Sequence, residues 1–600
     1  MSDAEAPSAG GEFLIRPCGS HRIFTPEDFS EEQRMYFQTA EKFSMEEVVP
    51  RVREIEAKTP GVMVELLKQA GAIGLLGVDV PVEYGGLGAD KTTSMLMTET
   101  ITRVASFSVS LGAHTGIGTL PIVYFGTEAQ KQRYLPKLAS GEWLAAYALT
   151  EPSSGSDALA ALTRADLSPD GKEWTLNGTK QFITNAAFAD VFTVFAQVDG
   201  TKFTAFIVER VHPGVSIGPE EKKLGIRGSS TCQVILTDCK VPAENVLGEI
   251  GRGHKIAFNI LNVGRWKLGV GSIGAARECL RLAAEYGAVR KQFGRPIGEF
   301  GLIRKTLAKI ATLIYVGESM AYRTAGLIDR AVARIEADAR HDAETVKIIE
   351  EYTIEASILK VFGSEALDYS ADEALQIHGG YGFTEEYPIE RMLRDSRINR
   401  IFEGTNEINR LFIPTNLLRR AQRGRLGLMA AAMAAFADAQ KTPEAEEPAH
   451  SLRPAGALGI ETRALEAAKS ALMYTLSIAG RKLGESIKDR QQVLGNLADA
   501  VIDLYGMDCA LARTLQWVAA RGAESAELPL AMARLWCEAA HERVFDACRE
   551  IIMWLTEGEE FGTDMRTINR LYSKTPIDAM RLRHRVATAV LAGGGYPLAR

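Results

Sequence analysis

This sequence of 600 residues has no closely spaced cysteine pair, no large excess of positive or negative charge, and no long hydrophobic run. Seven cysteines are scattered without a C-x-x-C pair, and nine histidines form no H-E-x-x-H, so we expect reduced thiols and no metal site. The net charge of −7 leaves no basic footprint for nucleic acid. The longest clean apolar run, residues 426–437, is shorter than the ~18 residues that a membrane span needs.

The first twenty residues also lack an apolar segment and carry acids early. This pattern argues against a secretory signal, and the segment is too poor in arginine for a convincing transit peptide. We therefore expect a cytoplasmic, bacterial-like protein without a membrane span.

Changes in periodicity along the chain predict several domains, mainly α-helical with a central β domain. Ser30 is a candidate helix cap, and β-branched and aromatic residues cluster after residue 147 in short runs separated by Gly, Asp and Asn. We expect a polar tail at 1–25, an N-terminal helical domain at 26–146, a middle β domain at 147–253, a helical bundle at 254–424, a linker or membrane-surface segment at 425–455, and a C-terminal helical domain at 456–600.

The hexapeptide GVGSIG at 269–274 matches the dinucleotide pattern G-x-G-x-x-G. That fold requires a strand before the glycines, whereas the preceding NILNVGRWKL reads as a helix. We reject a dinucleotide site and expect these small residues to allow close helix packing.

Three other segments carry polar groups suited to ligands. The loop YALTEPSSGSD (147–157) could bind an anionic ligand through hydroxyls and backbone N–H groups, although a plain polar loop explains it as well. In QFITN (181–185), Phe182 and Thr184 share one side of a strand, where they could stack on and hydrogen-bond a planar ring; a partly buried strand is the alternative. His378, in QIHGGYGF, is expected to be a packing residue.

The segment RIFEGTNEINRLF (400–412) sets a carboxylate, Glu403, directly after Ile401 and Phe402. Burial disfavours the charged form of an acid. Glu403 is therefore either a solvated loop residue or a base held in a dry place.

Five segments together resemble the acyl-CoA dehydrogenase family: YALTEPSSGSD, FITN, VRKQFGRPI, QIHGGYGFTEEYP and RIFEGTNEINRL. The resemblance covers residues 30–420, and the length, FGLIRKTLAKI (301–311) and the added C-terminal module are most similar to the very-long-chain branch with its assembly-factor paralogue. It implies a helical, β-barrel and helical-bundle architecture with an additional C-terminal helical domain. It also implies FAD, a long-chain acyl-CoA substrate, electron-transferring flavoprotein as the acceptor, and a homodimer.

Within this family, Glu403 resembles the catalytic base, which removes the α-proton while the β-hydrogen leaves as hydride to flavin N5. Its apolar neighbours would raise its pKa toward working pH, and its backbone N–H would bind the thioester carbonyl. The resemblance implies FAD contacts at Tyr147, Leu149, Thr150, Ser156, Phe182, Ile183, Thr184, Thr405, Asn406 and Glu407, with Arg290, Gln376, Gly379 and Gly380 reaching the FAD of a neighbouring subunit. It implies substrate contacts at Ser156, Asn262, Arg265 and Gly404.

Several positions depart from the family pattern or refine it. Phe182 stands where the family often has Trp, and Phe300-Gly301 replace a His-Gln pair of medium-chain members, which puts that FAD contact in doubt. Small residues at the expected floor of the acyl pocket predict a deep cavity and long acyl chains: Val109, Gly112 and Ala113.

Two other functions remain open, an acyl-CoA oxidase that uses O₂ and an assembly or scaffold protein that retains the fold. A membrane contact is also open. Four arginines, at 419, 420, 423 and 425, precede an alanine-rich segment, so residues 419–440 could lie on an anionic lipid surface. An amphipathic helix packed on its own domain explains the segment equally well.

Overall fold

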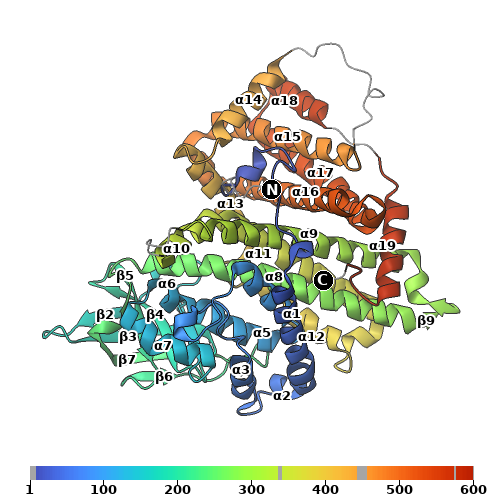
Figure 1. The fold of residues 1–600 in the computed structure, drawn as a ribbon. Helices are drawn as coiled ribbons and strands as arrows, with labels where there is room; N and C mark the ends of the chain where they lie inside the picture. The colour runs from blue at the N-terminus through green and yellow to red at the C-terminus, as the bar shows by residue number, and fades with distance from the viewer. Residues whose placement is uncertain (1–7, 336–340, 442–455, 573–575, 599–600) are drawn as a thin grey trace.

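The computed structural model describes residues 8–335, 341–441, 456–572 and 576–598 (Figure 1). Helices α8 (Gly253–Val289), α9 (Gly301–Val332) and α11 (Thr353–His378) form a central layer. The sheet and the first helices cover one side of it, and the last helices cover the other. The mainly helical fold with a central sheet, expected from periodicity, is confirmed. None of the described helices is long and apolar enough to cross a membrane.

The N-terminal helices begin at Ser30, which caps α1 in a reciprocal capping box with Gln33, as the sequence predicts. These helices pack around a core of their own and lead into the first strand. Their bounds are α1 Glu31–Phe43, α2 Val52–Glu56, α3 Val62–Ala72, α4 Lys91–Thr100, α5 Ala105–Gly112, η6 Ala113–Gly118, α6 Leu120–Phe125 and α7 Glu128–Ser140.

Eight strands form one sheet in the order β6-β7-β3-β2-β4-β5-β8, with β1 parallel to β4. Phenylalanines Phe192 and Phe206 and the aliphatic side chains around them fill its core. The register of β3 against β7 shifts between Lys180 and Ile183, so the end of β3 is bulged. The strands are β1 Ala145–Ala148, β2 Arg164–Leu167, β3 Glu173–Thr184, β4 Val191–Val198, β5 Lys202–Glu209, β6 Val215–Ile217, β7 Thr231–Pro242 and β8 Val246–Leu247.

The helical bundle is built on α8, which carries GVGSIG in its interior, so the rejection of a dinucleotide loop is confirmed. A Cβ at Gly269 would stand 2.5 Å from the Leu359 carbonyl oxygen, and one at Gly274 would stand 2.1 Å from that of Glu99. Because glycine has no Cβ, the backbones of α11 and α4 can pack directly against the backbone of α8 at these two positions. The bundle comprises α8 Gly253–Val289, the hairpin β9 Lys291–Gln292 and β10 Arg295–Pro296, α9 Gly301–Val332, α10 His341–Glu351, α11 Thr353–His378, η10 Gly379–Phe383, α12 Pro388–Ser396 and α13 Asn406–Gln422.

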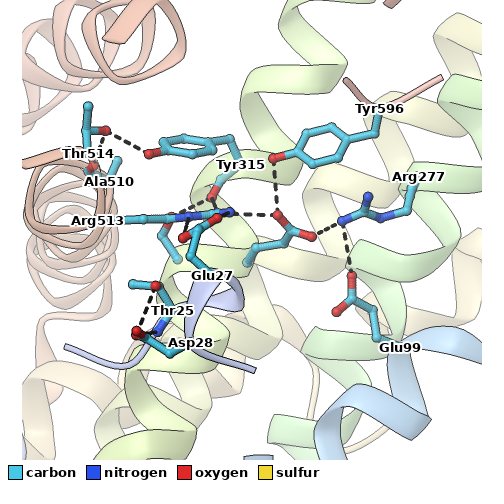
Figure 2. Close-up of polar contacts among 12 residues, drawn as sticks. Thr25, Glu27, Asp28, Glu99, Arg277, Tyr315, Ala510, Arg513, Thr514 and Tyr596 are labelled. Atoms are coloured by element: carbon cyan, nitrogen blue, oxygen red, sulfur yellow. Dashed lines mark hydrogen bonds and ion pairs between the residues drawn. The ribbon is translucent and has the colours of Figure 1, made fainter. Parts of the chain in front are cut away.

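A buried ionic network joins the C-terminal helices to the bundle (Figure 2). Arg513 of α16 pairs with Glu27 and Glu318, and Tyr596 donates to Glu318 at 3.1 Å. Although burial raises the pKa of Glu27, the Arg513 guanidinium holds it below its usual value. The C-terminal elements are α14 Leu428–Gln440, α15 Gly459–Leu483, α16 Gln491–Arg521, α17 Glu527–Leu555, α18 Gly558–Leu571 and α19 Ala579–Gly593.

The N-terminal segment differs from the polar tail that its first residues suggest. Phe13, Leu14 and Ile23 are buried, and the backbone N–H groups of Gly10 and Gly11 donate to carboxylates at the start of α11 and the end of α10. The few apolar side chains between the polar residues are sufficient to anchor residues 8–25 on the helices.

The expected linker at 425–455 contains a helix, α14, which packs on α15. Leu428 and Ala432 are buried, and the ring of Phe436 stacks on Tyr474 at 5.8 Å, as expected for an amphipathic helix on its own domain. Arg420, one of the four arginines before it, is buried and pairs with Glu351. Residues 442–455 lie outside the described ranges.

Candidate active site

A cavity of about 1400 Å³, the central cavity, lies between the end of the sheet, α4 to η6, α8 and α13. It brings together most of the residues that the sequence singles out. Its lining includes Val109, Gly112, Ala113, Tyr147, Leu149, Thr150, Ser156, Phe182, Ile183, Thr184, Asn262, Arg265, Glu403 and Gly404.

Glu403 lies in the left-handed backbone region with φ of 58°, and Gly404 follows at 77°. A non-glycine residue adopts this conformation at a cost that the surrounding structure must offset, and such strain often marks functional sites. The carboxylate is enclosed, and its Oε2 atom has no hydrogen-bond partner among the described residues. Burial raises the pKa of Glu403 to about 7, while the positive charges of Arg265 and Lys360 oppose the shift. Glu403 as a residue is half-buried, but its carboxylate is enclosed, so it is a desolvated acid rather than a solvated loop residue.

The loop that holds Glu403 is fixed by the helices on both sides. Arg265 of α8 donates from Nε to the Glu403 carbonyl oxygen at 3.2 Å, and Asn409 donates to the Gly404 carbonyl at 2.9 Å. Thr405 caps α13, with its hydroxyl accepting from the Ile408 N–H at 3.2 Å. These bonds set the direction of the Glu403 side chain.

Lys360 is a site residue that sequence reasoning missed. It is fully buried on α11, and its Nζ donates to Asn406 Oδ1 at 2.7 Å, three residues after Glu403. Burial lowers the pKa of Lys360 to about 7, and the Glu403 carboxylate is the charge that most strongly opposes this. The only sequence signal is a lysine within the apolar run ASILKVFG, which any amphipathic helix could contain.

The opposite wall of the central cavity is the bulged end of β3. Phe182 has φ of 59° and is 61% exposed, Ile183 points into the sheet core, and Thr184 is half-buried. An exposed aromatic ring at a strand end that opens into a cavity suits a planar ligand. Phe182 and Thr184 both line the central cavity, as does Ile183 between them.

A second group of expected residues lies away from the central cavity. Gln376, Gly379 and Gly380 are exposed at the end of α11, and the Arg290 guanidinium lies 5.5 Å from the ring centre of Tyr381 in η10. Near them, His378 is a packing residue as predicted, because it bonds its own helix and stacks on Tyr286.

The residues that follow Gly404 differ in their exposure to solvent. Glu407 is exposed, whereas Asn406 is buried and its amide bonds Lys360, Ser364 and Glu365. The Asn406 amide is therefore occupied within the protein, and it holds the Glu403 loop to α11.

Comparisons with known proteins define the class. Family models of acyl-CoA dehydrogenase domains match residues 30–142 (N-terminal), 146–239 (middle) and 251–418 (C-terminal), and a further C-terminal domain model matches 466–570. A crystal structure of an acyl-CoA dehydrogenase complexed with FAD from Bacillus anthracis is 45% identical, with a TM-score of 0.94 over 98% of this chain and 100% of that one.

Two sequence relatives narrow the class. The chain is 47% identical over 594 residues to a probable acyl-CoA dehydrogenase of Bacillus subtilis, covering 98% of both. It is 40% identical over 502 residues to the human mitochondrial very long-chain specific acyl-CoA dehydrogenase, covering 80% of this chain and 73% of that one. This chain belongs to the acyl-CoA dehydrogenase family, with the additional C-terminal helical domain of its larger members.

Proposed function

We propose that this protein uses FAD to convert long-chain acyl-CoA thioesters to trans-2-enoyl-CoA, the first step of fatty-acid β-oxidation. The observation that carries the proposal is the enclosed carboxylate of Glu403. Its Oε2 has no hydrogen-bond partner in the part of the chain that the structure describes, and it lines the same cavity as Phe182 and Thr184. The test is turnover of palmitoyl-CoA with an artificial electron acceptor. Glu403→Gln should retain FAD and lose turnover, whereas unchanged turnover would falsify the base assignment.

FAD fits the residues of the cavity wall. The open ring of Phe182 offers a flat face, and the hydroxyls of Thr150, Ser156 and Thr184 offer hydrogen bonds beside it. We assign these residues, with Tyr147, Leu149 and Ile183, to the cofactor. When bound, FAD supplies the acceptor for the two electrons of the reaction.

Glu403 acts as the general base at the α-carbon of the substrate. Its Oε2 accepts the α-proton, and a pKa of about 7 keeps half of the enzyme in the basic form near neutral pH. Positioned proton transfer of this kind contributes about 10²–10⁴-fold to the rate. The Glu403 backbone N–H has no acceptor within the described part of the chain, and we assign it to the thioester carbonyl oxygen, where it polarises the C=O bond.

The length of the cavity along α8 favours long acyl chains. Gly264, beside Glu403, and Leu268, Gly271 and Ala275 all line it at helical spacing. Eleven residues of helix rise about 16 Å, and an extended alkyl chain advances ~1.3 Å per carbon, so roughly a dozen carbons fit beyond the α-carbon. A chain-length series of kcat/KM tests this, and an optimum at C4 to C8 would refute it.

We propose a homodimer in which Arg290, Gln376, Gly379 and Gly380 reach the FAD of the partner subunit. Large apolar side chains are exposed beside them, with Phe293 91% and Phe383 86% accessible. Exposed apolar groups of this size gather where surfaces associate. Sedimentation equilibrium should give twice the chain mass, and a monomer that binds FAD fully would contradict the assignment.

Electron-transferring flavoprotein is the acceptor that we propose, on the basis of family membership. Measuring oxygen uptake distinguishes a dehydrogenase that uses this acceptor from an oxidase, which would pass the electrons to O₂. Rapid oxygen consumption with palmitoyl-CoA and no added acceptor would refute the proposed acceptor.

We propose that the domains span residues 26–146, 147–253, 254–424 and 456–600.

We also propose a cytoplasmic location with peripheral membrane contact. The contact would use the outer face of α14, where Met429 and Met433 are 46% and 68% exposed. Met433→Glu should abolish co-sedimentation with anionic vesicles if this contact exists.

A further inference from the structure

Exposed cations gather at one end of the central cavity, and we call them the cationic mouth. They come from the start of α8, from α10 and from the end of α13, with Arg252 and Arg423 as the cap residues, and the carboxylates of Glu249 and Glu350 line the same end. The five cationic residues of the mouth are Arg252, Lys255, Lys347, Arg419 and Arg423.

Most of these cations lack an ion pair. Within the described ranges no carboxylate oxygen lies within 4.0 Å of Arg252, Lys255, Arg419 or Arg423, whereas Lys347 pairs with Glu344. The neighbouring arginines of the same segment behave differently, because 420 and 425 both pair with Glu351. Arg419 lies in the last turn of α13, and Arg423 caps its end four residues later, so that their like charges repel. An unbalanced pair of this kind is suited to an anionic ligand.

The distance from Glu403 matches one kind of anion. Ile408 and Arg419 both line the central cavity on α13, and the eleven residues between them rise about 16 Å. A pantetheine arm, roughly a dozen bonds at ~1.3 Å each, also spans about 16 Å from its sulfur to its first phosphate. A thioester held at Glu403 would therefore bring the phosphates of coenzyme A to the cationic mouth.

We propose that Arg419 and Arg423 bind the phosphates of coenzyme A, so that the enzyme selects acyl-CoA over acyl chains carried on pantetheine or on a carrier protein. This rests on the proposed function. A guanidinium binds phosphate through two parallel hydrogen bonds. Coenzyme A presents a diphosphate and a 3′-phosphate, whereas the carrier-bound arm presents one phosphodiester, so the cationic mouth favours the nucleotide-bearing substrate.

The test compares lauroyl-CoA with lauroyl-pantetheine, using FAD-loaded enzyme and the double variant Arg419→Ala/Arg423→Ala. We expect KM for lauroyl-CoA to rise about tenfold or more, since a hydrogen bond to a charged group contributes this much. The kcat value and the kinetics of lauroyl-pantetheine should not change. Arg425→Ala, which removes a paired arginine outside the cavity, is the matched control and should leave both substrates unaffected.

Two results of this comparison would overturn the proposal. One is an equal rise in KM for both substrates. The other is an unchanged KM for lauroyl-CoA together with lost binding to vesicles of anionic phospholipid, which would assign the arginines to a membrane surface.

Calorimetry with adenosine 3′,5′-bisphosphate separates this proposal from the proposed function. Even without turnover, the bisphosphate should bind the wild type and not the double variant, and equal binding would refute the phosphate site.

Discussion

Gly264 lies directly against the carboxylate of Glu403. A Cβ at residue 264 would stand 2.8 Å from Glu403 Oε2 and 3.1 Å from Oε1, closer than side chains normally approach. Gly264 is in the interior of α8, where its backbone is helical and needs no special conformation. Glycine is therefore required here for space, because α8 forms the floor beneath the proposed base.

Gly264→Ala should displace the Glu403 carboxylate and lower kcat by about tenfold or more, since misplacement by ~1 Å can cost 10²-fold. FAD content should be unchanged, because the three atoms nearest the added Cβ all belong to the Glu403 carboxylate. Gly495→Ala is the control, a glycine within α16 whose added Cβ meets nothing within 4 Å. A variant with normal kcat would show that the carboxylate does not need its observed position.

The pH profile of kcat/KM should rise with pH and level off above about 7. Glu403 accepts a proton only when ionised, and burial places its pKa at about 7, so acid pH removes the active form. Stopped-flow reduction between pH 5.5 and 8.5 measures this. A flat profile through pH 7 would show that Glu403 has an ordinary pKa or does not act as the base.

Lys360→Met should move this acid limb to higher pH, by about one unit. The Lys360 ammonium favours the ionised form of Glu403, and its removal makes the carboxylate hold its proton more tightly. Since the pKa of Lys360 is also about 7, the two groups titrate as a coupled pair. Lys360→Arg, which keeps the positive charge, should return the acid limb of the profile to its wild-type pH. An unshifted limb in Lys360→Met, with Tm reduced, would leave Lys360 a purely structural role.

Gly271→Leu should shorten the preferred acyl chain. Gly271 faces Thr98 and Thr102 across the cavity, at 3.9 and 3.7 Å from a built Cβ, so a larger side chain closes the passage there. Seven residues of helix separate it from Gly264, a rise of about 10 Å, or roughly eight carbons. We expect kcat/KM to fall at least tenfold for palmitoyl-CoA and to stay unchanged for octanoyl-CoA. An equal loss for both chain lengths would place the acyl chain elsewhere.

Arg513→Met should destabilise the junction of the C-terminal helices. Arg513 is buried between Glu27 and Glu318, and removing one member of a buried ion pair costs about 3–5 kcal/mol because it leaves buried charge without a partner (Figure 2). The Tm should fall by several degrees. Arg581→Ala, which removes an exposed pair with Asp578, should change stability by less than about 1 kcal/mol. A Tm equal to the wild type would show that packing alone holds the junction.

The sequence predicted the elements whose signals are local. The Ser30 cap and the helical reading of GVGSIG both depend on neighbouring residues, and both are confirmed. Resemblance to the family, rather than periodicity, identified most residues that line the central cavity.

Long-range contacts could not be predicted in the same way. The buried Lys360 meets Asn406 across 46 positions of sequence, and Gly10 meets Glu351 across 341. A lysine in an apolar helix and a few apolar residues in a tail are common, so only the folded chain distinguishes them. The sequence also gives no sign that Arg419 lacks an ion pair among the described residues, because its neighbour Arg420 is an arginine too and pairs with Glu351.

Anaerobic titration of the purified protein with palmitoyl-CoA tests the central claim most directly. The account predicts a yellow protein whose visible flavin absorbance is bleached by one equivalent of substrate, and a Glu403→Gln variant that is equally yellow but is not bleached. A protein that takes up no FAD, or a variant that is bleached as fast as the wild type, would contradict it.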